Sequence, residues 1–131
     1  VYQPGSVKVI AYKDGKEWAK DEIQTTGEAQ KIQLSVDHAS IIGSEDELAF
    51  VTATIVDASG RKVPTACLPL KVEVTGCGEL VATDNGDPTS FTPFQSAERE
   101  SFNGLALAIV QGKKGTTGKM QVPFHNLSYP A

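Results

Sequence analysis

Apolar and polar side chains alternate over short segments of this chain, and no helix-length stretch repeats apolar positions at helical spacing. Segments 7–11 and 32–36 show the alternation most clearly. A period of two residues is typical of a strand with one face toward a core. Turn sequences such as Asp14-Gly15 separate the segments at intervals of about 8–12 residues, which predicts an antiparallel β-sandwich. The chain is therefore expected to be all-β.

We expect strands at 7–12, 17–24, 32–36, 48–56, 70–75, 79–83, 100–110 and 117–124. With an irregular edge step at 63–64, the part from Gln30 onward holds seven candidate strands, the number of an immunoglobulin-like sandwich. Segment 48–56 is apolar at both alternations, so burial on both faces is expected. Segment 100–110 is expected to be the longest strand, with a bulge at Gly104.

The first hairpin is surplus to this sandwich. Asp14-Gly15 is the sequence of a tight turn between two strands, and an isolated two-stranded ribbon is only marginally stable in water. We therefore assign residues 1–28 to the C-terminal hairpin of a preceding β-domain plus a linker, and residues 29–131 to the immunoglobulin-like β-sandwich. Because the chain opens at Val1 without a signal peptide, it is interpreted as a piece of a longer protein.

Charge and hydropathy exclude two classes of partner. The 131 residues carry 12 Lys and Arg against 16 Asp and Glu, a formal charge of −4, which is the wrong sign for binding a phosphate backbone. No apolar run approaches the roughly 20 residues that cross a bilayer. We expect no nucleic-acid partner and no membrane span.

No catalytic, cofactor or metal site is predicted. Cys67 and Cys77 bracket an expected strand of about 30 Å, so no disulfide between them is expected, and both are interpreted as small apolar fillers. Glu79, Asp84 and Asp87 form the nearest approach to a carboxylate cluster, but turn formation explains them better than metal binding. Whether the loop at 84–93 binds an ion is left open. The longer polar segment, 84–97, is interpreted as a functional or interfacial loop.

Several motifs occur in the order found in a known family. They are Tyr2 to Lys16, Thr26-Gly27-Glu28-Ala29, Phe50 to Asp57, Gly60 to Pro64, Val74 to Leu80, Asp84 to Ser90 and Phe102 to Ala106. Together they resemble the C-terminal β-sandwich region of bacterial β-galactosidase-like enzymes of the second glycoside hydrolase family. The resemblance implies a parent enzyme that retains anomeric configuration by means of two barrel glutamates. Neither the barrel nor its Asn-Glu-Pro motif is in this sequence, so no catalytic residue is assigned. The resemblance also implies a periplasmic or extracellular location in a bacterium.

Three functions are weighed on this basis. The first is a non-catalytic accessory module that packs against other domains of the same parent enzyme, with Trp18, Phe91 and Phe94 as its interaction surface. The second is a carbohydrate-binding module, in which these aromatic rings stack on a glycan. The third is an adhesin-like structural repeat, because immunoglobulin-like folds serve many unrelated roles. An independent enzyme is the least favoured reading.

Overall fold

A computed structural model of the chain describes residues 1, 3–41 and 47–128. Tyr2 and the last three residues of the predicted sandwich lie outside the described residues. The described part contains strands and no helix, which confirms the all-β prediction. The strands are β1 Ser6–Lys13, β2 Lys16–Gln24, β3 Lys31–Val36, β4 Leu48–Val56, β5 Pro69–Val72, β6 Thr75–Gly76, β7 Gly78–Asp84, β8 Glu98–Glu100, β9 Leu105–Gly112, β10 Met120–Gln121 and β11 Phe124–Asn126.

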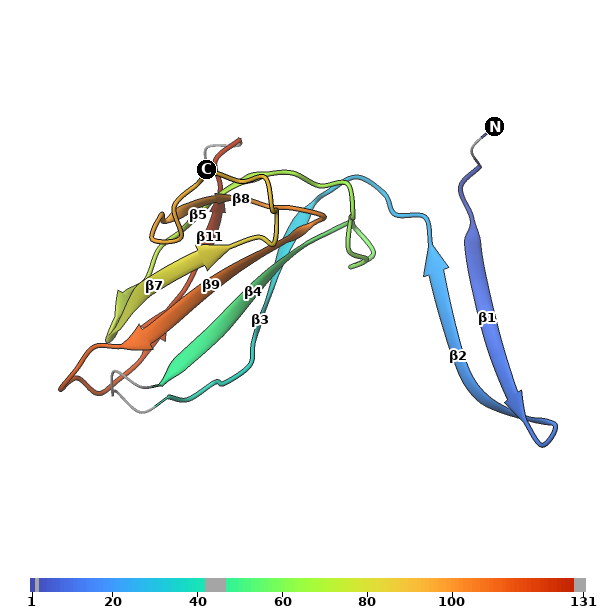
Figure 1. The fold of residues 1–131 in the computed structure, drawn as a ribbon, viewed down its shortest axis with the longest axis horizontal. Helices are drawn as coiled ribbons and strands as arrows, with labels where there is room; N and C mark the ends of the chain where they lie inside the picture. Colours follow the sequence, from blue (N-terminus) through green and yellow to red (C-terminus); the bar gives the residue numbers. More distant parts are fainter. Residues whose placement is uncertain (2, 42–46, 129–131) are drawn as a thin grey trace.

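Strands β3 to β11 build the predicted immunoglobulin-like sandwich (Figure 1). One layer is a four-stranded sheet in the order β3-β4-β9-β7, and the other is a three-stranded sheet in the order β11-β5-β8. The short strands β6 and β10 form a separate pair. All pairings are antiparallel.

The core lies between the two layers. It takes every second residue of β4 and β9, and from the opposite layer it takes Leu70, Val72 and Phe124. The central inward positions of β4 and β9 include the paired alanines Ala53 and Ala106, which leave room for larger side chains from the facing sheet. Strand β4 is not buried equally on both faces as predicted: its alternate positions are only partly covered, because no second layer lies over that side.

The predicted long strand at 100–110 is wrong. Its residues form two strands in different sheets, β8 and β9, joined by a tight turn. Asn103 and Gly104 have positive φ values of 51° and 76° in this turn. A Cβ at Gly104 would collide with the carbonyl oxygen of Val63. Gly104 therefore allows the chain to cross from one sheet to the other, where the sequence had suggested a bulge within one strand.

The strands predicted at 70–75 and 117–124 are divided in the same way. Strand β5 ends at Val72, and its continuation pairs as β6 with β10. After β10 the chain passes through Pro123 before β11 pairs with β5. Nine short strands therefore follow residue 30 within the described ranges, where seven were predicted, because local periodicity does not show where a strand changes sheets.

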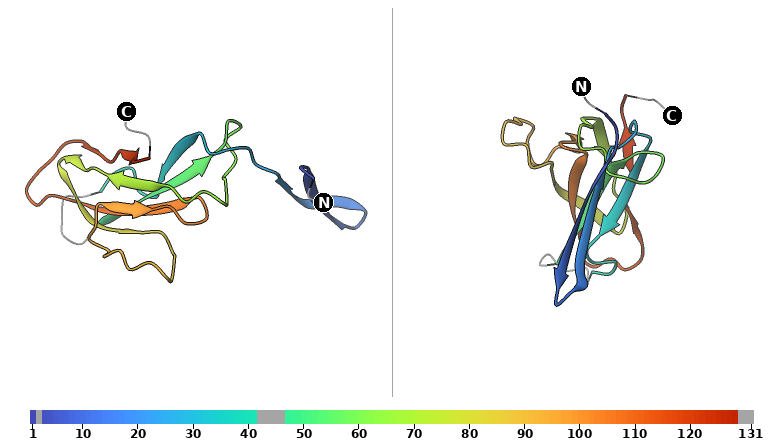
Figure 2. Two further views of the ribbon diagram at one scale, coloured as in Figure 1. Left: turned by 90° about the horizontal axis from the view of Figure 1, so that it is seen from above. Right: turned by 90° about the vertical axis from the view of Figure 1, so that its right-hand side faces the viewer.

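The predicted hairpin extends from one end of the sandwich (Figures 1 and 2). Strands β1 and β2 pair with each other, and Asp14 and Gly15 occupy the turn with φ values of 51° and 73°. A register shift between Ala11 and Tyr12 marks a bulge. Every residue of β2 is exposed.

Candidate interaction surfaces

The three aromatic residues predicted as an interaction surface are exposed but do not form one patch. Trp18, on β2 of the hairpin, is 73% exposed. Phe91 and Phe94 lie on the loop between β7 and β8 and are 100% and 60% exposed. The hairpin and this loop leave the sandwich in different directions (Figure 2). The single apolar patch expected of an accessory module is therefore not formed by these three residues, which counts against them as one interface and leaves two separate candidate surfaces.

The hairpin has one mainly apolar face. Val7 is paired with Ile23 and Ala11 with Ala19, and Val9 between them is paired with Asp21, the one charged residue among these three pairs. Val7, Val9 and Ile23 are each more than 60% exposed. These residues were not among those predicted as an interaction surface. The alternation of apolar and polar residues in a hairpin outside the sandwich was the signal that could have identified them.

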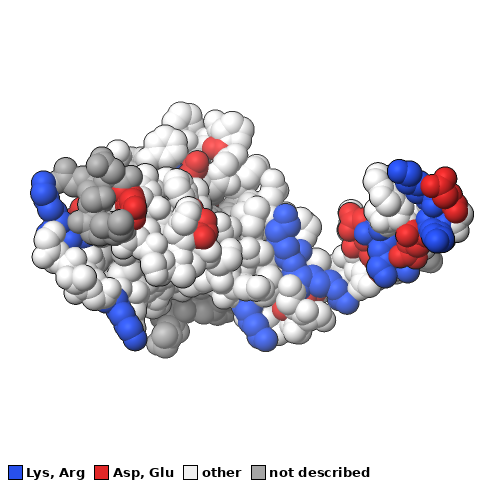
Figure 3. Space-filling view, turned by 90° about the horizontal axis from the view of Figure 1, so that it is seen from below, with Lys and Arg blue, Asp and Glu red and all other residues white. Residues whose placement is uncertain are grey.

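The opposite face of the hairpin carries charge. Lys8 is paired with Glu22 and Ile10 with Lys20, so each of these pairs contributes at least one charged side chain to this face. Charged side chains gather over the hairpin in Figure 3 and are sparser on the visible face of the sandwich. The hairpin is thus an amphipathic ribbon, and its apolar face has no partner among the described residues.

A buried arginine organises the second surface. Arg99, on β8, is only 3% exposed, and its guanidinium donates hydrogen bonds into the loop at 84–97 and its flanking residues. Nε donates to Thr83 Oγ1 at 3.1 Å and Nη2 to Thr83 O at 2.8 Å. Nη2 also donates to Pro93 O at 2.9 Å. Nη1 donates to Thr92 O at 3.1 Å and to Ser90 Oγ at 3.4 Å.

Further bonds hold the same loop against β7 and β8. Thr83 donates from its backbone N to Phe94 O at 2.6 Å and from Oγ1 to Ser96 O at 2.7 Å. Asn85 Nδ2 donates to Glu100 O at 2.9 Å. The Arg99 guanidinium carbon lies 5.9 Å from the centre of the Phe94 ring, within the range of a cation–π contact. The loop is therefore fixed at both ends and in its middle.

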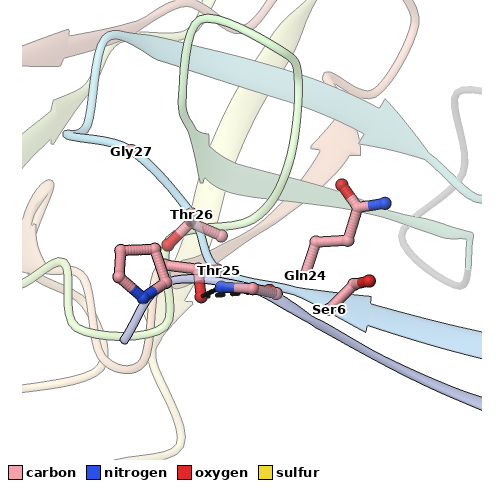
Figure 4. A pocket seen from close by; sticks show the side chains of 7 residues that line it. Ser6, Gln24, Thr25, Thr26 and Gly27 are labelled. Atoms are coloured by element: carbon pink, nitrogen blue, oxygen red, sulfur yellow. Dashed lines mark hydrogen bonds between the residues drawn. The ribbon is translucent and has the colours of Figure 1, made fainter. Parts of the chain in front are cut away.

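The base of the hairpin is closed by Thr25 (Figure 4). Its backbone N donates to Gly5 O at 2.9 Å, and the Gly5 N donates to Thr25 Oγ1 at 3.0 Å. These groups line a shallow pocket between the hairpin and the linker, together with Ser6, Gln24 and Gly27. The described lining of this pocket carries no charged side chain, so it offers no acid–base chemistry.

Asp57 connects the linker to the sandwich. Its Oδ2 accepts a hydrogen bond from the backbone N of Gly27 at 2.9 Å, and its Oδ1 accepts bonds from the backbone N of Arg61 and of Ser59, each at 2.9 Å. The N–H group of Gly27, followed by those of Arg61 and Ser59, lowers the pKa of the Asp57 carboxyl below its ordinary value of 3.8. This buried carboxylate determines where the chain enters the sandwich.

Residues for catalysis or metal binding are not gathered in the described part of the chain. No group of three or more His, Cys, Asp or Glu there lies close enough to hold a metal ion. Asp84 and Asp87 accept N–H groups of their own turns, as the turn interpretation predicts. A groove of about 660 Å³ lies beside β3, lined in part by Leu34 and Met120, and none of its described lining residues is Asp or Glu.

The cysteines differ in their surroundings. Cys67 and Cys77 are free thiols. Cys77 is half-buried, and its Sγ donates to Lys119 O at 3.1 Å. Cys67 is exposed, so its interpretation as an apolar filler is wrong: its neighbours Ala66 and Leu68 pack on the core, and Cys67 between them does not.

Fold and surface together define the class of protein: an all-β sandwich module with an amphipathic hairpin and an anchored aromatic loop. No helix in the described residues is long and apolar enough to cross a membrane. The family model for the glycoside hydrolase family 2 C-terminal domain 5 matches residues 32–127. The chain belongs to this family, as the sequence resemblance indicated.

Two curated relatives of this chain are beta-galactosidases. Beta-galactosidase BoGH2A of Bacteroides ovatus is 36% identical over 116 residues, which are 87% of this chain and 14% of that protein. A beta-galactosidase of Thermoanaerobacter pseudethanolicus is 32% identical over 76 residues, 58% of this chain and 10% of that protein. The chain therefore corresponds to about one seventh or less of the length of these curated relatives.

Solved structures agree with the fold. A beta-glycosidase from Bacteroides vulgatus superposes with a TM-score of 0.91 at 27% identity, over 96% of this chain and 16% of that one. A glycosyl hydrolase family 2 member from Bacteroides cellulosilyticus gives a TM-score of 0.90 at 25% identity, over 98% of this chain and 18% of that one. Nearly the whole chain, hairpin included, thus has a counterpart in larger family 2 proteins.

Proposed function

We propose that this chain is a non-catalytic accessory module of a bacterial β-galactosidase-like glycoside hydrolase, which packs against other domains of that enzyme and supports them. The observation that carries the proposal is the unpartnered apolar face of the hairpin, in a chain that belongs to a C-terminal domain family of such enzymes. Exposed apolar faces of this kind mark protein interfaces, and contacts between domains typically bury about 600–1,500 Å².

In this proposal residues 1–28 complete a preceding β-domain and residues 29–131 form the accessory sandwich. Two observations support the boundary. The family match begins at residue 32, beyond the hairpin. Among the described residues the hairpin strands pair only with each other, and the buried and partly buried residues of the core lie at or beyond Ile32. A ribbon of two strands gains stability when its apolar face is covered, so a preceding domain is the natural cover.

The chemistry of the parent enzyme is part of the same proposal. The beta-galactosidase relatives support a β-galactoside as the substrate class, cleaved with retention by two carboxylates that lie outside this chain. On the sequence resemblance we also propose a periplasmic or extracellular location. Direct hydrolysis by these 131 residues is not part of the proposal.

The test is to replace Val7 and Ile23, which face each other, singly by Lys within the full-length enzyme. Each side chain should lose about 1.5–3 kcal/mol of burial, so the melting temperature of the intact enzyme should fall by several degrees. Tyr12→Lys, on the other face of the hairpin, is the matched control and should have a smaller effect. Equal melting temperatures for all variants would contradict the proposal.

A second measurement addresses catalysis. The 131-residue chain should give no turnover of a chromogenic β-galactoside above the buffer rate, whereas the intact enzyme should hydrolyse it. Turnover by the chain itself, retained after repurification, would show that a catalytic site lies within it and would refute the accessory role.

A further inference from the structure

The loop at 84–97 combines full exposure of an aromatic side chain with a fixed backbone. Phe91 is 100% exposed, and Phe94 three residues later is 60% exposed. Connections of this length without secondary structure are uncommon in compact domains and are usually functional or disordered. This loop is held by hydrogen bonds to Arg99 and Thr83, so disorder does not explain it.

Arg99 makes the loop rigid at a cost to the fold. The five hydrogen bonds of its guanidinium go to neutral oxygens: two atoms of Thr83, the Ser90 hydroxyl and the carbonyls of Thr92 and Pro93. Burying a guanidinium without a carboxylate partner is unfavourable unless its N–H groups are satisfied, and here they are all directed to the loop and its flank. An aliphatic side chain would fill the same space at lower cost. The arginine is therefore best explained by the loop conformation that it holds.

The chemistry of the loop indicates an apolar partner with a basic rim. Residues 84–100 carry four carboxylates, Asp84, Asp87, Glu98 and Glu100, against the single buried guanidinium of Arg99, so the rings are presented from a negatively charged segment. Many of its polar groups are already engaged within the domain, including the Ser90 hydroxyl and the carbonyl groups that accept from Arg99. One side of the Phe94 ring faces the guanidinium. A glycan needs hydrogen-bonding groups beside the ring on which it stacks, whereas a protein pocket needs mainly the rings.

We propose that this loop is a pre-organised docking element, in which Arg99 positions Phe91 and Phe94 for insertion into an apolar, basic-rimmed pocket on another domain of the parent enzyme. The inference rests on the accessory role proposed above and adds a second contact to the hairpin. Pre-organisation favours docking because a backbone already held by hydrogen bonds loses less conformational entropy on binding. Arg99 is a positioning residue in this scheme, and the two rings make the contact.

Chymotryptic cleavage of the Phe94–Gln95 bond tests the fixed conformation in the 131-residue chain. The bond should be cut slowly in the wild-type chain despite its exposure. Arg99→Lys keeps the charge but cannot reach the same set of acceptors, so cleavage should be at least about tenfold faster. Phe91→Ala should leave the rate unchanged, and cleavage after Tyr12 in the hairpin is the internal reference. Equal rates in wild type and Arg99→Lys would overturn the role of Arg99.

The same cleavage in the full-length enzyme tests docking. Protection of Phe94–Gln95 should exceed that in the isolated chain by at least about tenfold, and Phe91→Ala should remove most of the added protection. A chain that carries both Arg99→Lys and Phe91→Ala should dock about as weakly as the chain with Phe91→Ala alone. The two effects should not add, because the arginine acts by positioning the ring. The variant with both Asp84→Asn and Asp87→Asn keeps turn-forming side chains but removes their charge. In this variant the protection of Phe94–Gln95 from chymotrypsin should depend less on salt concentration.

The outcomes separate the two proposals. If Val7→Lys destabilises the full-length enzyme but Phe91→Ala does not change protection, the accessory role stands and the docking loop is refuted. If neither variant has an effect, both are refuted. Protection of the isolated chain by lactose, without added protection in the full-length enzyme, would assign the loop to a glycan and overturn the inference.

Discussion

At the scale of single residues, carboxylates that accept backbone N–H groups hold the segments that enter and leave strands. Asp57 binds the N–H groups of Gly27 and of its own turn, and Asp37 accepts those of Phe50 and His38. In both residues these bonds lower the pKa of the carboxyl, most strongly through Gly27 for Asp57 and through Phe50 for Asp37. Short polar side chains thereby satisfy donors that the sheets leave unpaired.

The lowered pKa of Asp57 predicts acid sensitivity of the fold. In the unfolded chain the carboxyl titrates near its ordinary value of 3.8, and in the folded chain it titrates lower. Its contribution is therefore complete above pH 3.8 and is lost as pH falls through the folded pKa. Asp57→Asn should lower the urea midpoint at neutral pH, and this difference should shrink in acid below pH 3.8. Glu28→Gln, in the exposed linker, is the control; a constant difference across pH would contradict the prediction.

At the scale of elements, the turn between β8 and β9 sends the chain from one sheet to the other. Gly104 occupies this turn with a positive φ and with the backbone of Val63 against its α-carbon. Its N–H donates to Ala66 O at 3.1 Å, and its carbonyl accepts from Ile55 N at 2.8 Å. The turn is thus bonded to two other segments and has no freedom to shift.

Gly104→Ala should be strongly destabilising. A side chain there combines the strain of a positive φ, about 1–2 kcal/mol, with a collision against fixed backbone, so a loss of at least about 3 kcal/mol is expected. Gly86→Ala is the matched control, because Gly86 has a φ of 74° but open space around its α-carbon. Only the strain should apply there. Urea unfolding followed by circular dichroism measures both, and equal losses would show that the close approach is unimportant.

At the scale of the whole molecule, the hairpin and the sandwich differ in what stabilises them. The sandwich has a two-layer core around Ile55, Leu70 and Val110, whereas the hairpin has exposed faces on both sides. The isolated chain should therefore lose its two parts at different denaturant concentrations. In the intact enzyme, a domain packed over the hairpin should make the hairpin and the sandwich unfold at the same denaturant concentration.

Trp18 allows this prediction to be measured. It is the only tryptophan of the chain and lies on β2, so its fluorescence reports on the hairpin alone. In the 131-residue chain its emission should change at a lower urea concentration than the circular dichroism of the sandwich. Leu70→Ala should lower the free energy of unfolding of the sandwich by about 2–5 kcal/mol and leave the hairpin transition unchanged. Coincident transitions would show that the hairpin depends on the sandwich.

Much of this architecture could be predicted from local pattern, because a period of two and turn residues such as Asp14-Gly15 act over a few neighbouring positions. The class of fold and the first hairpin follow from that information. Motif order also identified the family. Local pattern failed at 100–110, where the alternation continues through a turn and gives no sign that the chain changes sheets.

What the sequence alone determined, then, is which segments are extended and where apolar side chains alternate, since these depend on each residue and its near neighbours. Only the tertiary structure decided which strands pair, that Arg99 reaches across to Thr83 and Pro93, and that Asp57 meets Gly27. These contacts join residues far apart in the chain or on opposite sides of a loop. They depend on how the layers pack in three dimensions, which a local pattern does not record.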